Sequence, residues 1–216
     1  MKIRNPDGTM EWTGDWSDNS DKWTPETIAQ TNMEIADDGI FWMCLEDFVA
    51  RIISVHICNY VEGHNFTSIK THEHDNKDGW HIYSVVLDTE GDHTFSVSQV
   101  DKLCIPKDRI YKYSTCRLII VKLINGFNFD DGVIYIDGKQ DSWERDYYLI
   151  CEGLLPGTYM AFVEFDWHEC VLKEKNSFCV TNYGPGNTEF KEVTEEYSRE
   201  QYLRLAFIAK LQQKGS

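Results

Sequence analysis

The sequence has no long hydrophobic run, no closely spaced pair of cysteines and no signal-peptide core. No apolar stretch approaches the ~20 residues that a membrane-crossing helix needs, and the N-terminal residues are too polar to direct secretion. The seven cysteines lie far apart, so neither a disulfide framework nor a Cys-x-x-Cys zinc site is indicated. These absences predict a cytoplasmic protein with free thiols.

Basic residues are scarce as well. The chain has 21 lysines and arginines against 36 aspartates and glutamates, which leaves a net charge of −15. A surface of this sign repels polyphosphate, so we expect no nucleic-acid partner. The Asp-x-Asp-x-Asp-Gly pattern of an EF-hand calcium loop is also missing. The sequence is rich in apolar and aromatic residues, with 42% hydrophobic residues, seven Trp and eleven Tyr. This composition predicts a globular protein.

Residues 1–62 form a Trp-rich first region. The tripeptide Thr24-Pro25-Glu26 is typical of a helix start, with an N-cap, a proline in the first turn and an acid beside the positive helix end. Later in this region, a turn signal is followed by the pattern of a strand, then of a short helix over 45–51, then of a second strand.

The rest of the chain changes pattern twice. Residues 63–78 are polar and without periodicity, which predicts a linker. Residues 79–190 contain seven short apolar runs separated by Gly, Asp, Asn or Pro, which predicts an antiparallel β-sandwich. Residues 191–216 predict a C-terminal amphipathic helix, whose apolar side chains recur at helical spacing at Tyr202, Leu205, Ile208 and Leu211.

Two motifs in the first region resemble the calpain family of cysteine proteases. The stretch IRNPDGTMEWTGDWSDNSDKW keeps the order of Asn-Pro, Gly, Glu-Trp, Gly and Trp-Ser-Asp that surrounds the family's catalytic asparagine. The stretch DDGIFWMCLEDFVARIISVHICN follows at the family's distance, and GLLPGTYMAFVEFDW is similar to a strand of the calpain β-sandwich domain. The resemblance implies a mainly β fold: the end of a calpain protease core, followed by an antiparallel β-sandwich and a C-terminal helix.

Calpains cleave proteins with a Cys–His–Asn triad, in that chain order. The resemblance assigns the third position to Asn5, whose side-chain carbonyl would accept the imidazole N–H and fix the ring of the histidine. Only four residues precede Asn5 and none is Cys or His, so we expect this chain alone to be inactive. The implied partner is an N-terminal protease half that carries both. Asp7 replaces a family tryptophan beside the active site, which implies an atypical or inactive parent.

The resemblance also implies a calcium site in the same region. Glu11, Asp18 and Asp38 match the family's carboxylate ligands, and the Ala36 carbonyl matches a backbone ligand. Calcium takes six to eight oxygens, several of them from carboxylates. Ile40 stands where the family has a further glutamate, so we expect a weakened site. Ordinary surface acids explain the same residues equally well.

Two functions stay open at this point. The first is the C-terminal part of a calcium-dependent intracellular cysteine endopeptidase that acts on protein substrates. The second is a non-catalytic calpain-like module that binds a protein or membrane partner, or a structural component of a large assembly. Membrane contact is expected only through the β-sandwich. A Cys in a Gln-Gly-x-Cys-Trp context and a later His, encoded ahead of Met1, would favour the protease; other residues there would favour the module.

Overall fold

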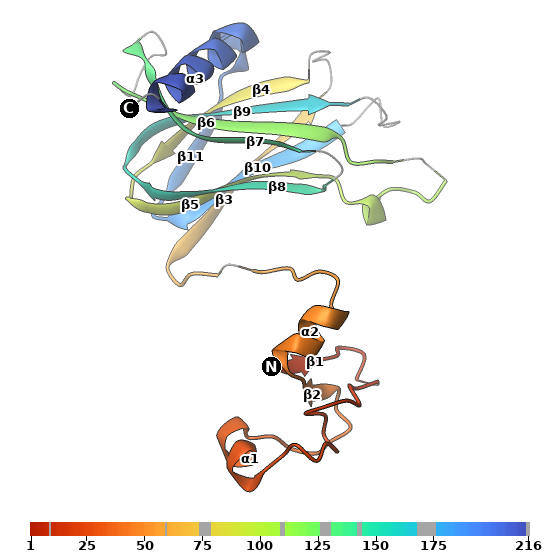
Figure 1. The fold of residues 1–216 in the computed structure, drawn as a ribbon. Helices are drawn as coiled ribbons and strands as arrows, with labels where there is room; N and C mark the ends of the chain where they lie inside the picture. Colours follow the sequence, from red (N-terminus) through yellow and green to blue (C-terminus); the bar gives the residue numbers. More distant parts are fainter. Residues whose placement is uncertain are drawn as a thin grey trace. The chain divides into compact units, whose positions relative to one another are not determined.

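The computed structural model describes residues 1–8, 10–58, 60–73, 79–108, 111–125, 131–141, 144–167 and 176–214. The chain divides into two compact units, Met1–Asn59 and Tyr60–Ser216 (Figure 1). The first unit carries the Trp-rich motifs, and the second carries the short apolar runs. None of the helices described is both long enough and apolar enough to cross a membrane.

The first unit contains two short strands and two short helices. The strands β1 and β2 pair antiparallel, and the elements in chain order are β1 (Lys2–Arg4), α1 (Pro25–Thr31), β2 (Ile40–Trp42) and α2 (Leu45–Arg51). The predicted helix start at Thr24 is confirmed. Its hydroxyl accepts from the Thr27 amide at 3.2 Å, and the Thr27 hydroxyl accepts from the Thr24 amide at 2.9 Å. This reciprocal pair is a capping box in which a threonine takes the usual place of Glu or Gln.

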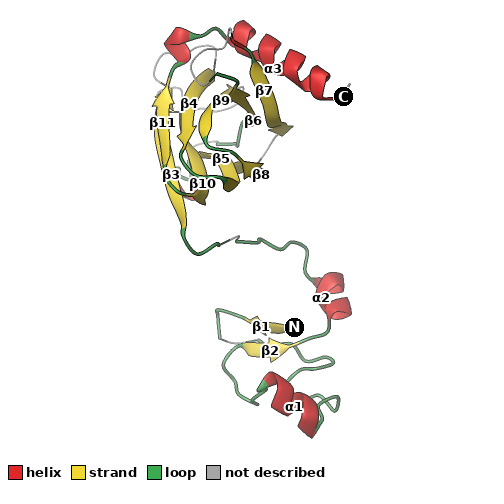
Figure 2. Cartoon of the chain, turned by 90° about the vertical axis from the view of Figure 1, so that its left-hand side faces the viewer, coloured by secondary structure: helices red, strands yellow, loops and turns green. Residues whose placement is uncertain are grey.

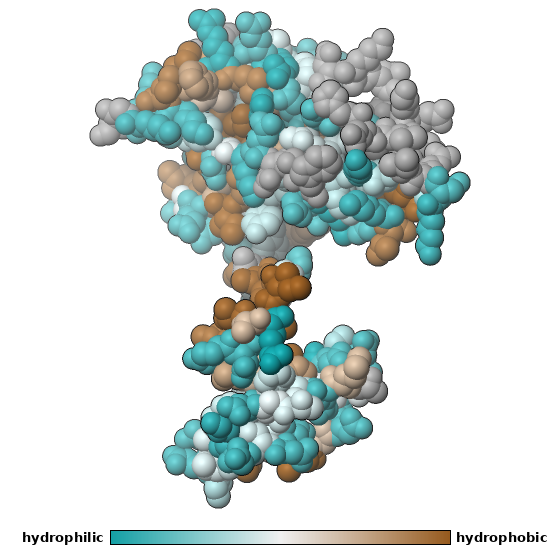
Figure 3. Space-filling model, turned by 45° about the vertical axis from the view of Figure 1, so that its right-hand side comes forward, coloured by the Kyte–Doolittle hydropathy of each residue, from teal (hydrophilic) through white to brown (hydrophobic). Residues whose placement is uncertain are grey.

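The second strand predicted after α2 is wrong. Residues 52–58 form no strand, and Ile53 and Ile57 are exposed to 103% and 80%. β-branched residues favour strands, but a strand also needs a neighbour for its backbone groups. In the described part of this unit the sheet consists of β1 and β2 alone. Hydrophobic side chains reach the surface of both units (Figure 3).

The second unit is a sandwich of two antiparallel sheets, as predicted (Figure 2). One sheet has the order β3 (His64–Glu73), β10 (Asn176–Pro185), β5 (Gly91–Gln99) and β8 (Asp146–Leu154). The other has the order β11 (Thr188–Glu192), β4 (Trp80–Leu87), β9 (Gly157–Asp166), β6 (Thr115–Leu123) and β7 (Val133–Asp141). Short 3-10 turns lie at η1 (Lys102–Cys104) and η3 (Thr194–Glu196). All seven predicted strands are present.

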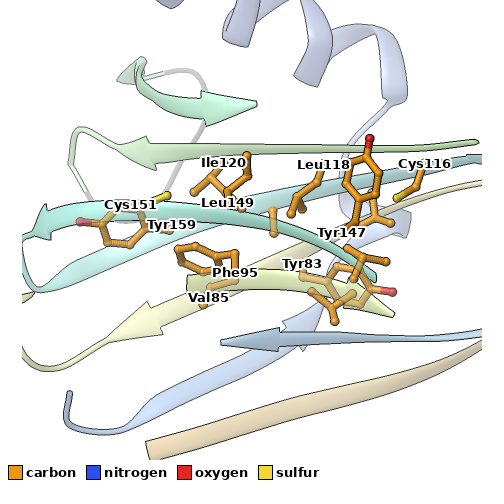
Figure 4. Packing of buried hydrophobic residues seen from close by; sticks show 14 of the residues in the cluster. Tyr83, Val85, Phe95, Cys116, Leu118, Ile120, Tyr147, Leu149, Cys151 and Tyr159 are labelled. Atoms are coloured by element: carbon orange, nitrogen blue, oxygen red, sulfur yellow. The ribbon is translucent and has the colours of Figure 1, made fainter. Parts of the chain in front are cut away.

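The main core lies between the two sheets and is built from alternate residues of the strands (Figure 4). Phe95 and Val97 of β5 are buried from one side, and Leu118 and Ile120 of β6 from the other. Tyr83 of β4 lies among them, and its hydroxyl is buried too. Successive side chains of a strand point to opposite faces, so this alternation is what the period-two pattern of the apolar runs predicted.

A second core lies on the other face of the five-stranded sheet, under α3 (Arg199–Lys214) (Figure 1). Tyr202 is its central residue: it is fully buried and its ring stacks on Phe162 with centroids 5.1 Å apart. Its hydroxyl donates to the carbonyl oxygens of Ile119 and Met160, at 3.0 and 2.8 Å. The helix is therefore fastened to β6 and β9 by apolar contact and by hydrogen bonds.

The helix predicted over 191–216 begins later than expected. α3 starts after Ser198, whose hydroxyl accepts from the Gln201 amide at 3.1 Å. Of the residues before it, 191–192 end the edge strand β11, which pairs with β4, and 194–196 form η3. The predicted apolar stripe is also only partly right, since Ile208 and Leu211 are 41% and 53% exposed. Alanines at positions 206 and 209 are buried instead, and their small side chains let the helix approach the sheet closely.

The linker predicted over 63–78 is corrected in its first part. Residues 64–73 form β3, which pairs with β10 along its whole length. Thr71 is buried and Ile69 packs against the core, whereas Ser68 and Lys70 are exposed. β3 buries few side chains, so it lacks the apolar run by which the other strands are recognised. Residues 74–78 lie outside the described residues.

Candidate functional site

The pairing of β1 with β2 positions the backbone of Asn5. The Asn5 amide donates to the Gly39 carbonyl at 2.7 Å, which extends the strand pairing by one bond. Gly39 has a φ of +80°, and a Cβ at this position would lie 2.5 Å from the Asn5 carbonyl oxygen. Glycine alone tolerates both the conformation and the close approach at low cost. The turn before β2 thus determines where Asn5 lies.

The Asn5 side chain is half-buried and held at both ends. Its carbonyl oxygen accepts from the Asp7 amide at 3.1 Å, and its Nδ2 donates to the Met10 carbonyl at 3.2 Å. The first contact is the side-chain turn typical of Asn before a bend. Together the two contacts set the plane of the amide. A half-exposed amide with a fixed plane can present its oxygen to a donor outside the unit.

Glu11 ties the Trp-rich loop to the turn before β2, and Asp38 stabilises that turn. One carboxylate oxygen of Glu11 accepts from the amides of Asp38 and Gly39, at 3.2 and 2.7 Å. The Asp38 carboxylate accepts from the Ile40 amide at 2.9 Å. Hydrogen bonds from amides to a carboxylate are stronger than neutral ones. The two acids therefore stabilise the loop conformation that presents Asn5.

Asp18 makes a similar contact from a buried position. The residue is 8% exposed, and its Oδ2 accepts from the Ala36 amide at 3.1 Å. Ala36 takes part through its N–H in this contact, whereas the expected calcium ligand was its carbonyl. Neighbouring Ser17 is also buried, at 6% exposed. Asp18 thus connects the same two segments as Glu11, at a second point.

The arrangement does not form a ready calcium cluster. Among the described residues, no three Asp, Glu, His or Cys side chains are grouped so that they could hold a metal ion. A cavity of about 640 Å³ has Glu11 and Asp18 in its lining, but neither Ala36 nor Asp38. Sequence reasoning missed the other acids beside it, which flank the matched positions: Asp15, Asp21 and Asp37. Hydrogen bonds link Glu11 with Asp38 and Asp18 with Ala36, but the four predicted ligands do not form one cluster.

Tryptophans of the two motifs form the frame of this site. Trp16 and Trp42 each meet Trp23 edge to face, with ring centroids 5.1 and 6.1 Å apart. The Trp23 indole donates to the Ser17 carbonyl at 2.8 Å. Such aromatic contacts are worth about 0.5–1.5 kcal/mol each beyond burial. The loop that carries Glu11 and Asp18 is therefore packed against the strand that pairs with β1.

Cys44 of this unit has a structural position. Its sulfur accepts from the Asp47 amide at 3.5 Å as the N-cap of α2, and its S–H donates to the Asp47 carboxylate at 3.1 Å. The amide contact lowers the pKa of the thiol, but the Asp47 carboxylate and the other acidic surroundings outweigh it, and the net pKa is raised. A raised pKa leaves little thiolate, which is the nucleophilic form. Cys44 does not have the setting of a catalytic cysteine.

Comparison with known proteins finds similarity in the first unit. The sequence pattern of the calpain family cysteine proteases matches residues 1–59. Over 62 residues the chain is 40% identical to calpain-9 of Rattus norvegicus and 44% identical to the calpain-2 catalytic subunit of Mus musculus. Each of these alignments covers 27% of this chain and 9% of the relative. Calpain-14 of Homo sapiens is 42% identical over 67 residues, 29% of this chain and 10% of the relative. The chain thus spans about a tenth of the length of these relatives.

One solved structure aligns weakly with this chain. The crystal structure of Yersinia pseudotuberculosis-derived mitogen aligns with 60% of this chain and 95% of that chain, at 9% identity and a TM-score of 0.36. The sandwich assignment therefore stands on the sheet order and register described above. The similarity to calpain-family cysteine proteases is confined to the first unit, residues 1–59.

Proposed function

We propose that residues 1–59 supply the asparagine segment of a calpain-type, calcium-dependent cysteine endopeptidase. In this proposal the Asn5 amide oxygen accepts the N–H of a catalytic imidazole. The ring is then held so that its other nitrogen takes the proton of a cysteine thiol, which becomes the nucleophile toward a peptide carbonyl. The cysteine and the histidine belong to a protease half that is not part of this sequence.

The observation that carries the proposal is the double restraint on Asn5. An orienting residue is effective when its own position is set before its partner arrives, because the ordering entropy is then not lost during the reaction. The backbone of Asn5 is held by Gly39, and its side chain by Asp7 and Met10. The same asparagine lies in the segment that matches the calpain family. The backbone position of Asn5, the restraint on its side chain and its sequence context all support the role of orienting the imidazole.

Calcium is a second part of the proposal. The carboxylates of Glu11 and Asp18 accept amide hydrogen bonds, so they would have to rearrange before they could share an ion with Asp38. Ile40 supplies no carboxylate to such a set. We therefore expect weak binding that is coupled to movement of the loop. We also place the parent protein in the cytoplasm, because the cysteines in the described residues are free thiols.

Reconstitution of a split protease tests the triad role. The whole chain is co-expressed with the Cys- and His-bearing half of the mouse calpain-2 catalytic subunit, and hydrolysis of a fluorogenic peptide is measured on the copurified complex. We expect activity that falls roughly 10²-fold or more with Asn5→Ala, because an unoriented imidazole is a poor base. Asn19→Ala is the matched control, since Asn19 is an exposed asparagine of the same unit. No copurification, no hydrolysis, or equal activity in the two variants would contradict the proposal.

A further inference from the structure

One cavity of the sandwich unit has the opposite charge to the rest of the protein. It has a volume of about 700 Å³ and lies between α3 and the strands β6 and β7. Five cationic side chains line it among the described residues, with Glu200 as the acid: Arg117, Lys139, Arg199, Arg204 and Lys210. The chain as a whole carries a net charge of −15. A local excess of cations on such a protein is a feature that general solubility does not explain.

The cations at one end of this groove are held in place by a single carboxylate. Arg117 donates to Glu164 at 2.8 Å, and Arg199 pairs with the other oxygen of the same carboxylate. Arg117 also donates to the Gln140 side-chain oxygen at 2.7 and 3.1 Å. One carboxylate thus pairs with two guanidinium groups. The restraint also lowers the entropy cost of using these side chains in binding.

The other part of the groove is apolar. Phe207 is 62% exposed on α3, and Leu203 and Ile119 are further apolar residues of the lining. Lys210 borders this part, with its Nζ 3.0 Å from the Tyr135 hydroxyl and 4.7 Å from the centre of the Tyr135 ring. Arg204 is exposed on the same helix. The groove therefore offers cationic donors next to a surface that a large apolar side chain can cover.

We propose that this groove binds a short acidic peptide that carries a large apolar side chain. Guanidinium groups match carboxylates with two parallel hydrogen bonds, and Phe207 and Leu203 give the apolar side chain a surface to bury against. A cavity of about 700 Å³ holds a few side chains, which is the scale of a peptide motif. The groove lies in the second unit, so the proposal is separate from the protease role of the first.

An acidic peptide fits better than an anionic membrane. A bilayer is flat and extended, so it would meet the wider negative surface of the protein as well as the groove. A short peptide enters the concave site and is affected mainly by charges within a Debye length, about 8–10 Å. The cations lie around a hollow between a helix and a sheet, which a protruding side chain can fill. The shape and the overall charge therefore both favour the peptide.

Fluorescence polarisation on the whole chain tests the proposal. The probe is a fluorescein-labelled peptide, Glu-Glu-Leu-Phe-Glu-Glu, and its matched control has glutamine at every glutamate position. We expect saturable binding of the acidic probe, and about tenfold weaker binding with Arg204→Glu, as for the loss of one charge-assisted contact. Lys70→Glu makes the same change of charge at an exposed position on β3 of the other sheet, and it should change the affinity less than twofold.

The apolar part is tested separately with Phe207→Ser, which should weaken binding of the acidic probe severalfold. Four results would overturn the proposal: no saturable binding at millimolar protein, equal binding of the glutamine peptide, equal effects of Arg204→Glu and Lys70→Glu, or no effect of Phe207→Ser. Vesicles of phosphatidylcholine with phosphatidylserine are measured in parallel. Binding to these vesicles without binding to the peptide would assign the groove to lipid and contradict the peptide proposal. Circular dichroism of each variant verifies that the sandwich is intact.

Discussion

Removing the Tyr202 hydroxyl tests how α3 is fastened to the sandwich. The hydroxyl is buried and donates to two carbonyl oxygens, one on β6 and one on β9. Burial raises the pKa of this phenol well above its ordinary value, so the group is a neutral donor throughout the physiological range. The substitution Tyr202→Phe keeps the ring and its stacking on Phe162 while deleting the donor.

The expected loss can be worked out from these contacts. Losing one buried hydrogen-bonding group costs about 1–2 kcal/mol of unfolding free energy, because both acceptors stay buried without their donor. For a unit of this size that corresponds to a fall in Tm of roughly 2–8 °C. Tyr202→Ala also removes the ring from the second core and leaves a cavity, which costs about 3–5 kcal/mol. Its Tm should therefore fall by about 6–20 °C.

Thermal unfolding followed by circular dichroism measures both effects. Tyr60→Phe is the matched control, since Tyr60 is 78% exposed and deleting its hydroxyl should leave the Tm within about 1 °C. If Tyr202→Phe and Tyr60→Phe unfold at the same temperature, the hydroxyl does not fasten α3 to the sheet and the reasoning is refuted. Contacts other than the Tyr202 hydroxyl would then have to hold α3, which lines the groove, against the sheet.

Two further predictions concern charge. Hydrogen bonds from the Thr89 hydroxyl, and then from the Asn187 amide and side chain, lower the pKa of Asp88 below its ordinary 3.8. The stabilisation from the ionised Asp88 is present above the unfolded pKa and is lost as the pH falls through the folded pKa. The difference in unfolding free energy between the native protein and Asp88→Asn, measured by urea unfolding, should therefore shrink below about pH 4. A difference that grows on acidification would refute the prediction. Calorimetric titration with calcium should give weak heats that disappear in an Asp18→Ala, Asp38→Ala double variant, and identical heats would eliminate the site.

The sequence predicted seven strands of the sandwich because they bury apolar side chains on their inner face. In β5 and β6 the buried residues alternate with less buried ones, which is a pattern visible without a structure. β3 and β11 escaped prediction because each buries few side chains, whereas β8 also lies at the edge of its sheet but buries alternate residues and was predicted. The buried face of α3 was misjudged in a similar way. Its contacts rest on Ala206 and Ala209, whose small side chains contribute little to an apolar pattern.

The candidate site was predicted by resemblance and not by pattern. The motifs led to the prediction of Asn5 and of four ligand positions, but the contacts that these residues make depend on the conformation of two loops. Whether a carboxylate faces a cation or a backbone amide is decided by where amides such as those of Ala36 and Gly39 come to lie. The basic groove could not be predicted at all from local sequence. Its residues Arg117 and Arg204 are far apart in the chain and are brought together by the packing of α3 on the sheet.

The first unit depends on its acids more than on an apolar core. Among its described residues, Met33 and Met43 are the buried apolar side chains, whereas Glu11 and Asp18 each hold backbone amides across two segments. A variant that removes such a carboxylate therefore removes a structural contact together with any ligand role. Asn at position 18 keeps an oxygen for the Ala36 amide and loses only the charge, whereas Ala loses both. If both Asp18→Asn and Asp18→Ala lose the calcium heats but only Asp18→Asn keeps the fold, the ligand role of Asp18 is separated from its structural role.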